Sequence, residues 1–410
     1  MVHLSIHRMT QEPKDKLFTK SFIFACIGNF LLFMGFYLLL PILPLYLIDT
    51  FHSSKSEVGV VLACYTVAAL AVRPFSAYLA DKFNRKPLYL MAYAFFIAVF
   101  VSYPLMELLL LFALMRVLHG LAFGMVTTAG NTLIVDILPS SRRGEGLGYF
   151  GIANNLAMAI GPMVGLMLHE TTGSYDLIFY SALGCGILGF FFASQIKTPE
   201  KLKSVNEPLS LDRFLLIKGL RAGICLLLMA IPYGITTSYV ALYAQELHLK
   251  GSMGLFFSMM AAGMIISRTF SGSMVDKGKI PQVITYGNIL VSIAIFLFAA
   301  LGPFSTKYLV LASSILYFVA FLLGVGYGMI FPAYNTLFVN LAPHNRRATA
   351  SSTYLTSWDV GIGFGLAFGG TMAEISGFPF TFFIGALLVM VSTIVFVTVA
   401  TPHYTRNKLR

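Results

Sequence analysis

The sequence predicts an all-α integral membrane protein, with twelve transmembrane helices in two pseudo-symmetric six-helix bundles. Composition is the first reason, because 57% of the 410 residues are hydrophobic, only 11% are charged, and the mean hydropathy is +0.80. A soluble domain has about 25% charged residues, so most of this surface must face lipid. Lipid cannot hydrogen-bond the backbone, so long apolar runs form helices. The alternating segments of a membrane β-barrel are missing from the sequence.

Apolar runs bounded by charged and turn residues give twelve predicted spans, each long enough to cross a bilayer. They cover residues 22–46, 57–80, 87–104, 108–135, 147–168, 177–196, 216–243, 251–275, 282–301, 308–338, 349–374 and 380–400. The longest polar stretch between spans covers residues 197–215. We interpret it as a cytoplasmic linker between an N-terminal bundle, residues 1–196, and a C-terminal bundle, residues 216–410.

Lysine and arginine gather in the predicted loops on the side that holds both termini. The loops on the opposite side hold only Lys55, Lys250 and Lys307. Cytoplasmic loops carry the excess of basic residues in membrane proteins. We therefore expect both termini in the cytoplasm and a multi-pass protein of the plasma membrane, favouring a bacterial inner membrane. This distribution explains the net charge of +11 without a nucleic-acid partner.

An internal repeat relates the two halves. Residues 73–82, RPFSAYLADK, match residues 268–277, RTFSGSMVDK, at an offset of 195. Residues 118–143 align without gaps to residues 322–347, at an offset of 204. Each half has six predicted spans, so both enter the membrane with the same orientation. Such parallel repeats place a binding cavity between the halves near the middle of the membrane.

The loop between spans two and three carries a family signature. Residues 77–86, AYLADKFNRK, resemble GxLaDrxGrk, the signature of the major facilitator superfamily, and the resemblance covers nearly the whole chain. The matching residues are Asp81, Arg85 and Lys86, with Asp276 and Lys277 in the shorter second copy. Ala77 and Asn84 replace the two glycines of the pattern. The resemblance implies the twelve-span fold and a transport function.

The carboxylates of this loop motif predict an inner gate. We expect Asp81 to approach the start of span eleven near Ala348, and Asp276 the start of span five near Gly144. A carboxylate is stabilised at the positive end of a helix dipole, so both contacts would close the cytoplasmic side. The alternative is that both are ordinary turn charges.

Span four contains a cation that needs an explanation. Arg116 to Gly120, RVLHG, resembles the family pattern RxxqG. A buried arginine is costly in a membrane unless it is paired or hydrated. Arg116 is therefore a candidate for facing the cavity or relaying protons. His119 lies one turn away on the same face, and either a protonation role or polar packing fits it.

Span eleven contains an acid, Asp359, deep within an apolar run. A carboxylate at such a position is a proton-coupling candidate, and a structural capping or pairing role is the alternative. We expect Asp136, at the inner end of span four, to pair with Arg73. We interpret Arg73 and its counterpart Arg268 as structural.

Span five has small residues at regular spacing. They are Gly148, Ala157, Gly161, Pro162 and Gly165, and they resemble a pattern of exporters and antiporters in the family, with Ala157 in place of a glycine. Small residues let helices pack closely, so we expect close packing of spans five and eight that limits leakage. Helix packing without any link to export is the alternative.

Spans one, four, seven and ten line the cavity of the resembled fold. The candidate lining residues are Asn29, Phe33, Tyr37, Phe123, Tyr233, Thr236, Thr237, Tyr327, Phe331 and Tyr334, with Trp358 beside Asp359. Together they predict an aromatic cavity for an amphipathic or apolar solute.

The resemblance implies a secondary active transporter and favours proton-coupled efflux of a small amphipathic or drug-like solute. The expected partners are the solute, protons and the bilayer. We expect a monomer, with the proton gradient in place of any cofactor. A proton-coupled importer of a sugar, peptide or organic acid is the alternative. No hydrolase or ATP-binding motif is present, and the four cysteines form no CxxC pair, so neither an enzyme nor a metal site is predicted.

Overall fold

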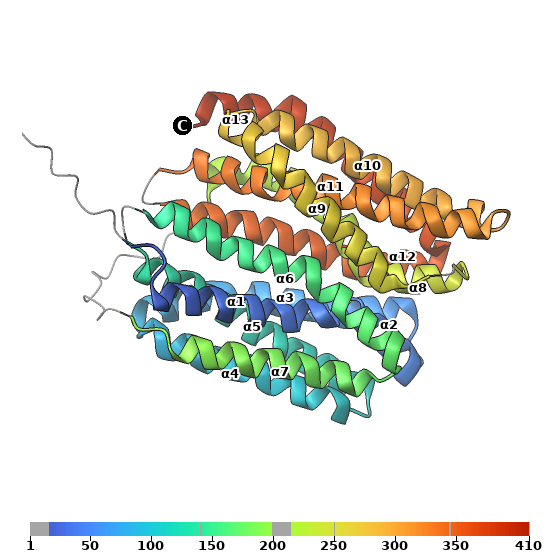
Figure 1. Ribbon diagram of the computed structural model, residues 1–410, viewed down its shortest axis with the longest axis horizontal. Helices are drawn as coiled ribbons and strands as arrows, with labels where there is room; N and C mark the ends of the chain where they lie inside the picture. Colours follow the sequence, from blue (N-terminus) through green and yellow to red (C-terminus); the bar gives the residue numbers. More distant parts are fainter. Residues whose placement is uncertain (1–15, 140–141, 199–214, 250, 344–345, 410) are drawn as a thin grey trace, which may run out of the picture.

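The computed structural model describes residues 16–139, 142–198, 215–249, 251–343 and 346–409, and these residues form helices and short connections without any strand (Figure 1). The helices are α1 (Lys20–Leu39), α2 (Ile42–Phe51), α3 (Lys55–Lys82), α4 (Arg85–Ser102), η1 (Tyr103–Leu105), α5 (Leu109–Ile137), α6 (Arg143–Thr172), α7 (Tyr175–Ser194), η4 (Ile217–Gly219), α8 (Leu220–Glu246), α9 (Met253–Asp276), α10 (Ile280–Ser305), α11 (Leu309–Leu341), α12 (Arg347–Val395), η6 (Phe396–Ala400) and α13 (Thr401–Asn407). Most of the predicted linker, residues 199–214, lies outside the described residues, so the proposed bundle boundaries stay a prediction.

The predicted twelve crossings are confirmed. Eleven helical stretches of the described chain are long and apolar enough to span a membrane, and the last of them, Thr349–Asn407, has 59 residues. One crossing needs roughly 20 residues. Gly377, with φ 79° and ψ 161°, interrupts this stretch in a conformation that glycine adopts far more readily than other residues. Helix α12 therefore contains both span eleven and the start of span twelve.

The first crossing is also interrupted. Helices α1 and α2 follow one another directly, and the break falls at Leu40 and Pro41. A proline has no backbone N–H to continue the helical ladder. The bend allows one crossing to change direction within the membrane.

The outer surface of the bundle is apolar. Leu110, Val310 and Ile375 are 72%, 75% and 78% exposed. Soluble proteins rarely expose large contiguous apolar patches, so these side chains face lipid. This is the surface expected of a multi-pass membrane protein.

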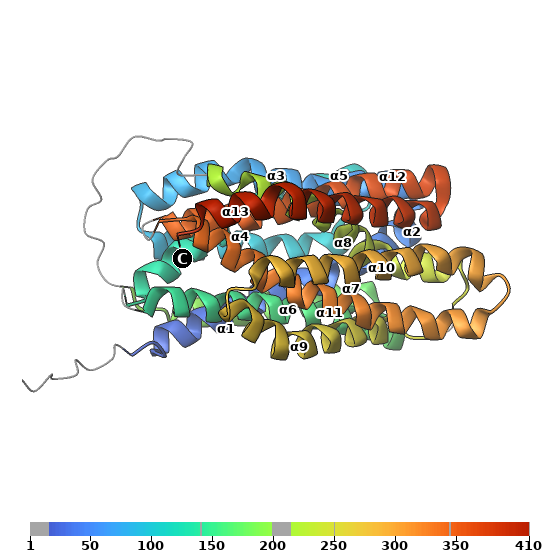
Figure 2. The same cartoon turned by 90° about the horizontal axis from the view of Figure 1, so that it is seen from above.

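The two halves meet along two pairs of helices. Helix α3 packs against α12, and α6 packs against α9. Figure 1 shows the blue-to-green helices grouped beside the yellow-to-red ones, and Figures 1 and 2 show the crossings nearly parallel. The start of α1 and the end of α13 lie at the same end of the bundle. We call this the terminal end and the opposite one, which holds Lys55 and Met253, the far end.

Candidate functional site

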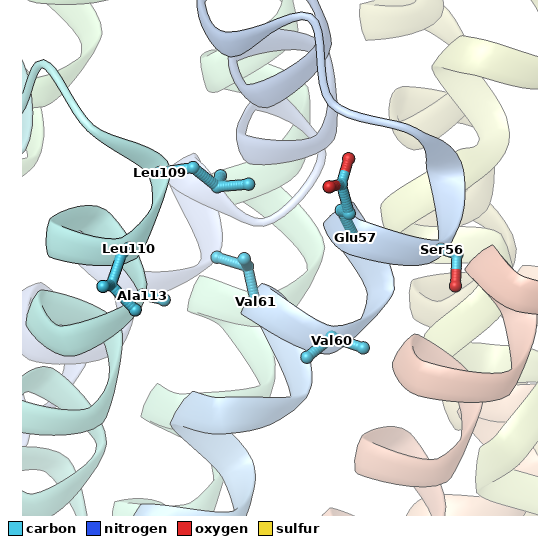
Figure 3. A pocket seen from close by; sticks show the side chains of 7 residues that line it. All are labelled: Ser56, Glu57, Val60, Val61, Leu109, Leu110 and Ala113. Carbon is cyan, nitrogen blue, oxygen red and sulfur yellow. The ribbon is translucent and has the colours of Figure 1, made fainter.

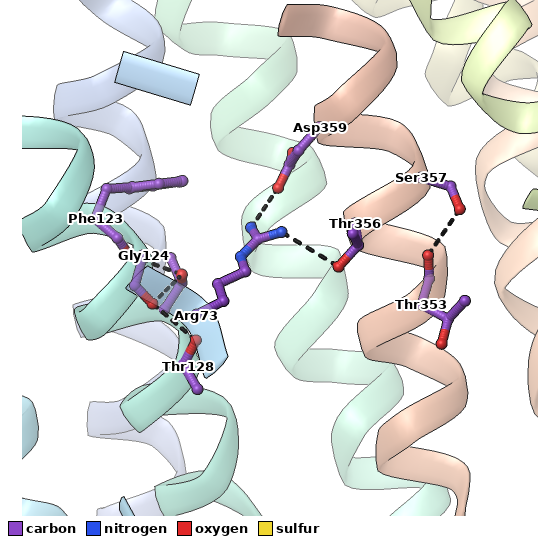
Figure 4. Close-up of polar contacts among 9 residues, drawn as sticks. Arg73, Phe123, Gly124, Thr128, Thr353, Thr356, Ser357 and Asp359 are labelled. Carbon is purple, nitrogen blue, oxygen red and sulfur yellow. Dashed lines mark hydrogen bonds and ion pairs between the residues drawn. The ribbon is translucent and has the colours of Figure 1, made fainter. Parts of the chain in front are cut away.

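An ion pair connects the two halves within the membrane. Arg73 on α3 pairs with Asp359 on α12, and a second guanidinium nitrogen of Arg73 donates to Thr356 Oγ1 at 3.5 Å (Figure 4). The Arg73 and Asp359 side chains are 17% and 27% exposed, so neither is fully buried. The expectation that Arg73 pairs with Asp136 is wrong, because Arg73 projects from α3 toward α12 rather than toward α5.

Asp136 instead pairs with Arg85. The same arginine donates from Nε to the carbonyl oxygen of Ala80 at 3.2 Å and from Nη1 to that of Thr132 at 3.5 Å. Arg85 therefore joins the end of α3, the start of α4 and the end of α5 within one half. This contact stiffens the loop that carries the family signature.

The remaining residues of that loop motif are less informative. Lys86 is half-buried and Lys277 is exposed. The side chains of Asp81 and Asp276 lie outside the described residues. Their predicted contacts near Ala348 and Gly144 therefore stay predictions.

Arg116 and His119 are buried inside the N-terminal half, 2% and 0% exposed. Arg116 Nη1 donates to the Tyr103 hydroxyl at 3.3 Å, and that hydroxyl lies 2.6 Å from His119 Nδ1. The Arg116 guanidinium also lies 4.3 Å from the centre of the Tyr65 ring, a cation–π contact. The Tyr103 hydroxyl therefore joins Arg116 and His119 in one buried polar network. Arg116 thus stabilises a buried network rather than facing an open cavity.

The candidate aromatic residues fall into two clusters. In the N-terminal half, the Phe33 ring packs against Tyr37 and Phe123, with centroids 6.0 and 5.6 Å apart. In the C-terminal half, the cluster consists of Tyr233, Tyr327, Phe331 and Trp358, with ring centroids 4.6 to 6.3 Å apart. Trp358 directly precedes Asp359 on α12, and Phe123 lies on the Arg73 side of the ion pair in Figure 4. The two clusters therefore flank the ion pair from opposite halves.

The other predicted lining residues lie in different surroundings. Asn29 donates to the Phe150 carbonyl at 3.4 Å. Thr236 and Thr237 donate to backbone carbonyls within α8. Tyr334 packs against Phe396, apart from the aromatic cluster. A direct solute contact for these residues stays a prediction.

The glycines of span five pack against span one, so the expected partner, span eight, is wrong for them. A Cβ on Gly161 would lie 2.6 Å from Tyr37 Cβ, and one on Gly165 would lie 2.1 Å from the Leu38 carbonyl oxygen. Pro162 lies inside α6 between them. A Cβ on Gly148, by contrast, would have no heavy atom within 4 Å. The close packing therefore holds α6 against α1 and α2 within one half, because this face of α6 is turned away from α9.

Two carboxylates hold the halves together at the far end, and the sequence interpretation missed both. Glu170, near the end of α6, accepts hydrogen bonds from the Ser252 hydroxyl and from the backbone N–H groups of Met253 and Gly254 at the start of α9, the last at 3.2 Å. Glu374 on α12 accepts from the backbone N–H of Lys55 at the start of α3, at 2.8 Å. The sequence does contain a signal that could have identified them, because Glu170 and Glu374 occupy matching positions of the repeat at the offset of 204.

We call the contacts of Glu170 and Glu374 with these helix N-termini the two latches. Further side-chain contacts lie beside them at the far end. Lys55 pairs with Glu246 at the end of α8, and its ammonium lies 4.8 Å from the centre of the Phe378 ring. The hydroxyls of Ser56 and Thr371 are 3.2 Å apart. All of these contacts join α3 to the C-terminal half.

A hollow at the far end lies away from the candidate site. It is lined mainly by apolar side chains of α3 and α5, from Ser56, Glu57, Val60, Val61, Leu109, Leu110 and Ala113 (Figure 3). It shares no residue with the ion pair or with either aromatic cluster. Its exposed Leu110 indicates a surface that faces lipid.

Comparisons with known proteins agree with this architecture. The model of the Major Facilitator Superfamily matches residues 25–365 and 291–410. A stretch of 172 residues is 31% identical to the quinolone resistance protein NorA of Staphylococcus aureus (strain Mu50 / ATCC 700699), and it covers 42% of this chain and 44% of NorA. The match thus spans less than half of that relative. The chain is also 25% identical over 369 residues to the uncharacterized MFS-type transporter MJ1560 of Methanocaldococcus jannaschii, covering 86% and 90% of the two chains.

The solved structures show the same fold. The nucleoside transporter NupG aligns with a TM-score of 0.70 over 92% of this chain and 98% of its own, at 15% identity. At that identity the likeness concerns the fold alone.

Proposed function

Because the chain belongs to the major facilitator superfamily, a family of membrane transporters and not of enzymes, we propose that it exports a small amphipathic solute in exchange for protons. Alternating access around the interface of the two halves moves the solute. The proton gradient is the energy source, without a cofactor. The protein acts as a monomer in the plasma membrane, a bacterial inner membrane in our proposal, with both termini in the cytoplasm.

The observation that carries this proposal is the ion pair of Arg73 and Asp359. A charge within the membrane is expensive without a partner, so the charged carboxylate favours conformations that keep α3 and α12 together at this level. Protonation neutralises Asp359 and removes that attraction. Proton binding is thereby linked to a change in the contact between the halves, which is what coupling requires.

Three further observations favour an amphipathic solute that is exported. Aromatic clusters of both halves flank the ion pair, and such side chains suit a solute with a flat apolar body. The partial relative NorA is named for quinolone resistance, and quinolones are aromatic amphipathic molecules. The span-five pattern of Gly161, Pro162 and Gly165 points in the same direction.

The test uses the full chain reconstituted into sealed vesicles that contain a pH-sensitive dye, with a fluorescent quinolone as the solute. An inward quinolone gradient should drive protons outward and raise the internal pH. Asp359→Asn should abolish this pH change, while exchange of quinolone between equal concentrations on the two sides continues. The matched control Asp176→Asn changes an exposed acid in the first turn of α7 and should behave like the wild type.

Two results would contradict the proposal. If protons move in the same direction as the solute, the protein is a symporter, and the import alternative replaces export. If Asp359→Asn couples as well as the wild type, the proton is carried by another group.

A further inference from the structure

The interface of α6 and α9 holds a cation without an acidic partner. Arg268 on α9 is half-buried, and its Nε is buried without a hydrogen-bond partner. Across the described residues, none of the hydrogen bonds or ion pairs involves this side chain. A guanidinium has five N–H donors and is always charged, so Arg268 has most of its binding capacity unused.

Arg268 lies on the face of α9 that carries Gly254. It lies 14 residues after Gly254, close to four helical turns, so the two share a face of α9. Gly254 packs on α6, where a Cβ would lie 2.4 Å from Met167 Cγ. Arg268 also lies within electrostatic reach of Tyr354 on α12, which itself lies within reach of Asp359. The cation therefore belongs to the side of α9 that packs against α6, at the contact between the halves.

The repeat shows what is missing at this position. Arg268 is the counterpart of Arg73, at the offset of 195. The two partners of Arg73 are Asp359 and Thr356, and at the offset of 204 their counterparts are Asn155 and Ile152 on α6. One carboxylate has become a neutral amide and one hydroxyl an alkyl group. Arg268 thus has no internal anion at the position where Asp359 stands opposite Arg73.

Glycines without close neighbours lie one turn from Arg268 on α9 and one to two turns from Asn155 on α6. Toward the terminal end from Asn155, a Cβ on Gly151 or Gly148 would meet no heavy atom within 4 Å, and the same holds for Gly272, one turn beyond Arg268. Arg116 is the other membrane cation without an ion pair in the described chain, but it is enclosed by Tyr65 and Tyr103. Arg268 is the better placed of the two to meet a solute.

We propose that Arg268 binds a carboxylate group of the transported solute, so that the solute class is aromatic or amphipathic monocarboxylates. This deepens the proposed function and rests on it. The planar guanidinium matches a carboxylate in a bidentate manner, and the solute then takes the place that Asp359 takes opposite Arg73. The apolar body of the solute lies toward the aromatic clusters.

The experiment measures binding to the purified full chain by calorimetry, with 2-naphthoate and its neutral isostere 2-naphthamide as probes. The wild type should bind the anion at least about tenfold more tightly, as a charge-assisted hydrogen bond implies. Arg268→Gln should reduce the preference to less than about threefold and leave 2-naphthamide binding unchanged. Asn155→Asp should reduce the preference for the anion in the same way, because it places a carboxylate where repeat symmetry puts the counterpart of Asp359. This second variant tests the proposal even if Arg268→Gln does not fold.

Each outcome decides the proposal. A preference for 2-naphthoate that survives both substitutions overturns it, and so does a wild type that does not bind 2-naphthoate. The measurement uses no pH gradient, so a failure of proton coupling in vesicles leaves this result standing. If proton coupling is intact but the protein does not prefer 2-naphthoate over 2-naphthamide, only the role proposed for Arg268 is wrong.

Discussion

The two ends of the bundle differ in how the halves meet. At the far end, Glu170 and Glu374 each reach from one half to the first backbone N–H groups of a helix in the other. At the terminal end, Gly148 of α6 and Gly272 of α9 have no neighbour within 4 Å of an added Cβ. The halves are therefore joined by carboxylate–backbone contacts at the far end, the predicted outside, while α6 and α9 carry glycines without close neighbours near the terminal end, the predicted cytoplasm.

This difference shows how one type of contact can control both ends. A carboxylate at the N-terminus of a helix gains from the unpaired N–H groups and the dipole there. Glu170 and Glu374 use this contact at the far end. The sequence predicts the same contact for Asp81 and Asp276 at the terminal end. If Asp81 and Asp276 make these predicted contacts, rocking of the halves would exchange one pair of carboxylate contacts for the other, and the balance between the pairs would decide the resting conformation.

The largest expected change in stability comes from substitutions that compare the packing at the two ends of α6. Gly165→Ala should destabilise the protein by about 2 kcal/mol, because overpacking against a fixed backbone typically costs ~1–3 kcal/mol, and the new Cβ would lie 2.1 Å from the Leu38 carbonyl oxygen. Gly148→Ala should instead stabilise it by about 1 kcal/mol through helix propensity. Thermal unfolding in detergent measures both. Equal effects of the two substitutions would show that the ends of α6 are packed alike.

A smaller effect is expected from releasing the latches. The double variant Glu170→Gln and Glu374→Gln should shift the balance toward far-end opening by about 1 kcal/mol, roughly fivefold, since exposed charge–dipole contacts contribute ~0.3–1 kcal/mol each. Distances between spin labels at Thr172 and His248, both exposed, should lengthen in a larger share of molecules.

The matched control for the latches is Glu57→Gln. Its carboxylate lies at the same end but accepts from the Ser54 backbone N–H at 2.8 Å, within the capping box of its own helix. It should leave the label distances as in the wild type. If the double variant also leaves them unchanged, the two carboxylates do not hold the far end.

The fold follows from the sequence almost completely, and the orientation of side chains does not. Twelve crossings could be predicted because apolar length and the lipid environment leave helices as the only solution. Gly161 and Gly165 could be recognised as packing residues, but periodicity gives only the faces of a helix. Which neighbour each face meets depends on the tertiary arrangement, and here the neighbour is span one instead of span eight.

The same limit applies to the candidate site. Asp359 could be singled out because a lone acid in an apolar span is costly. Its partner Arg73 was assigned to Asp136, since the pairing with Asp359 joins residues of different halves and no local pattern reports it. The sequence pattern predicts no role for Glu170, just after predicted span five, or for Glu374, the last residue of predicted span eleven. Only their matching positions in the repeat distinguish these two glutamates from other charged residues near the ends of spans.

The smallest effect separates side-chain pairing from backbone capping at the far end. Lys55 contributes its backbone N–H to Glu374 and its ammonium to Glu246. Lys55→Met removes only the ammonium, and exposed ion pairs contribute ~0.2–1 kcal/mol, so far-end opening should increase about twofold. Salt at 1 M shortens the screening length to about 3 Å and should bring the wild type close to the variant. If Lys55→Met opens the far end as much as the double glutamate variant does, the ion pair and not the helix N-termini controls closure.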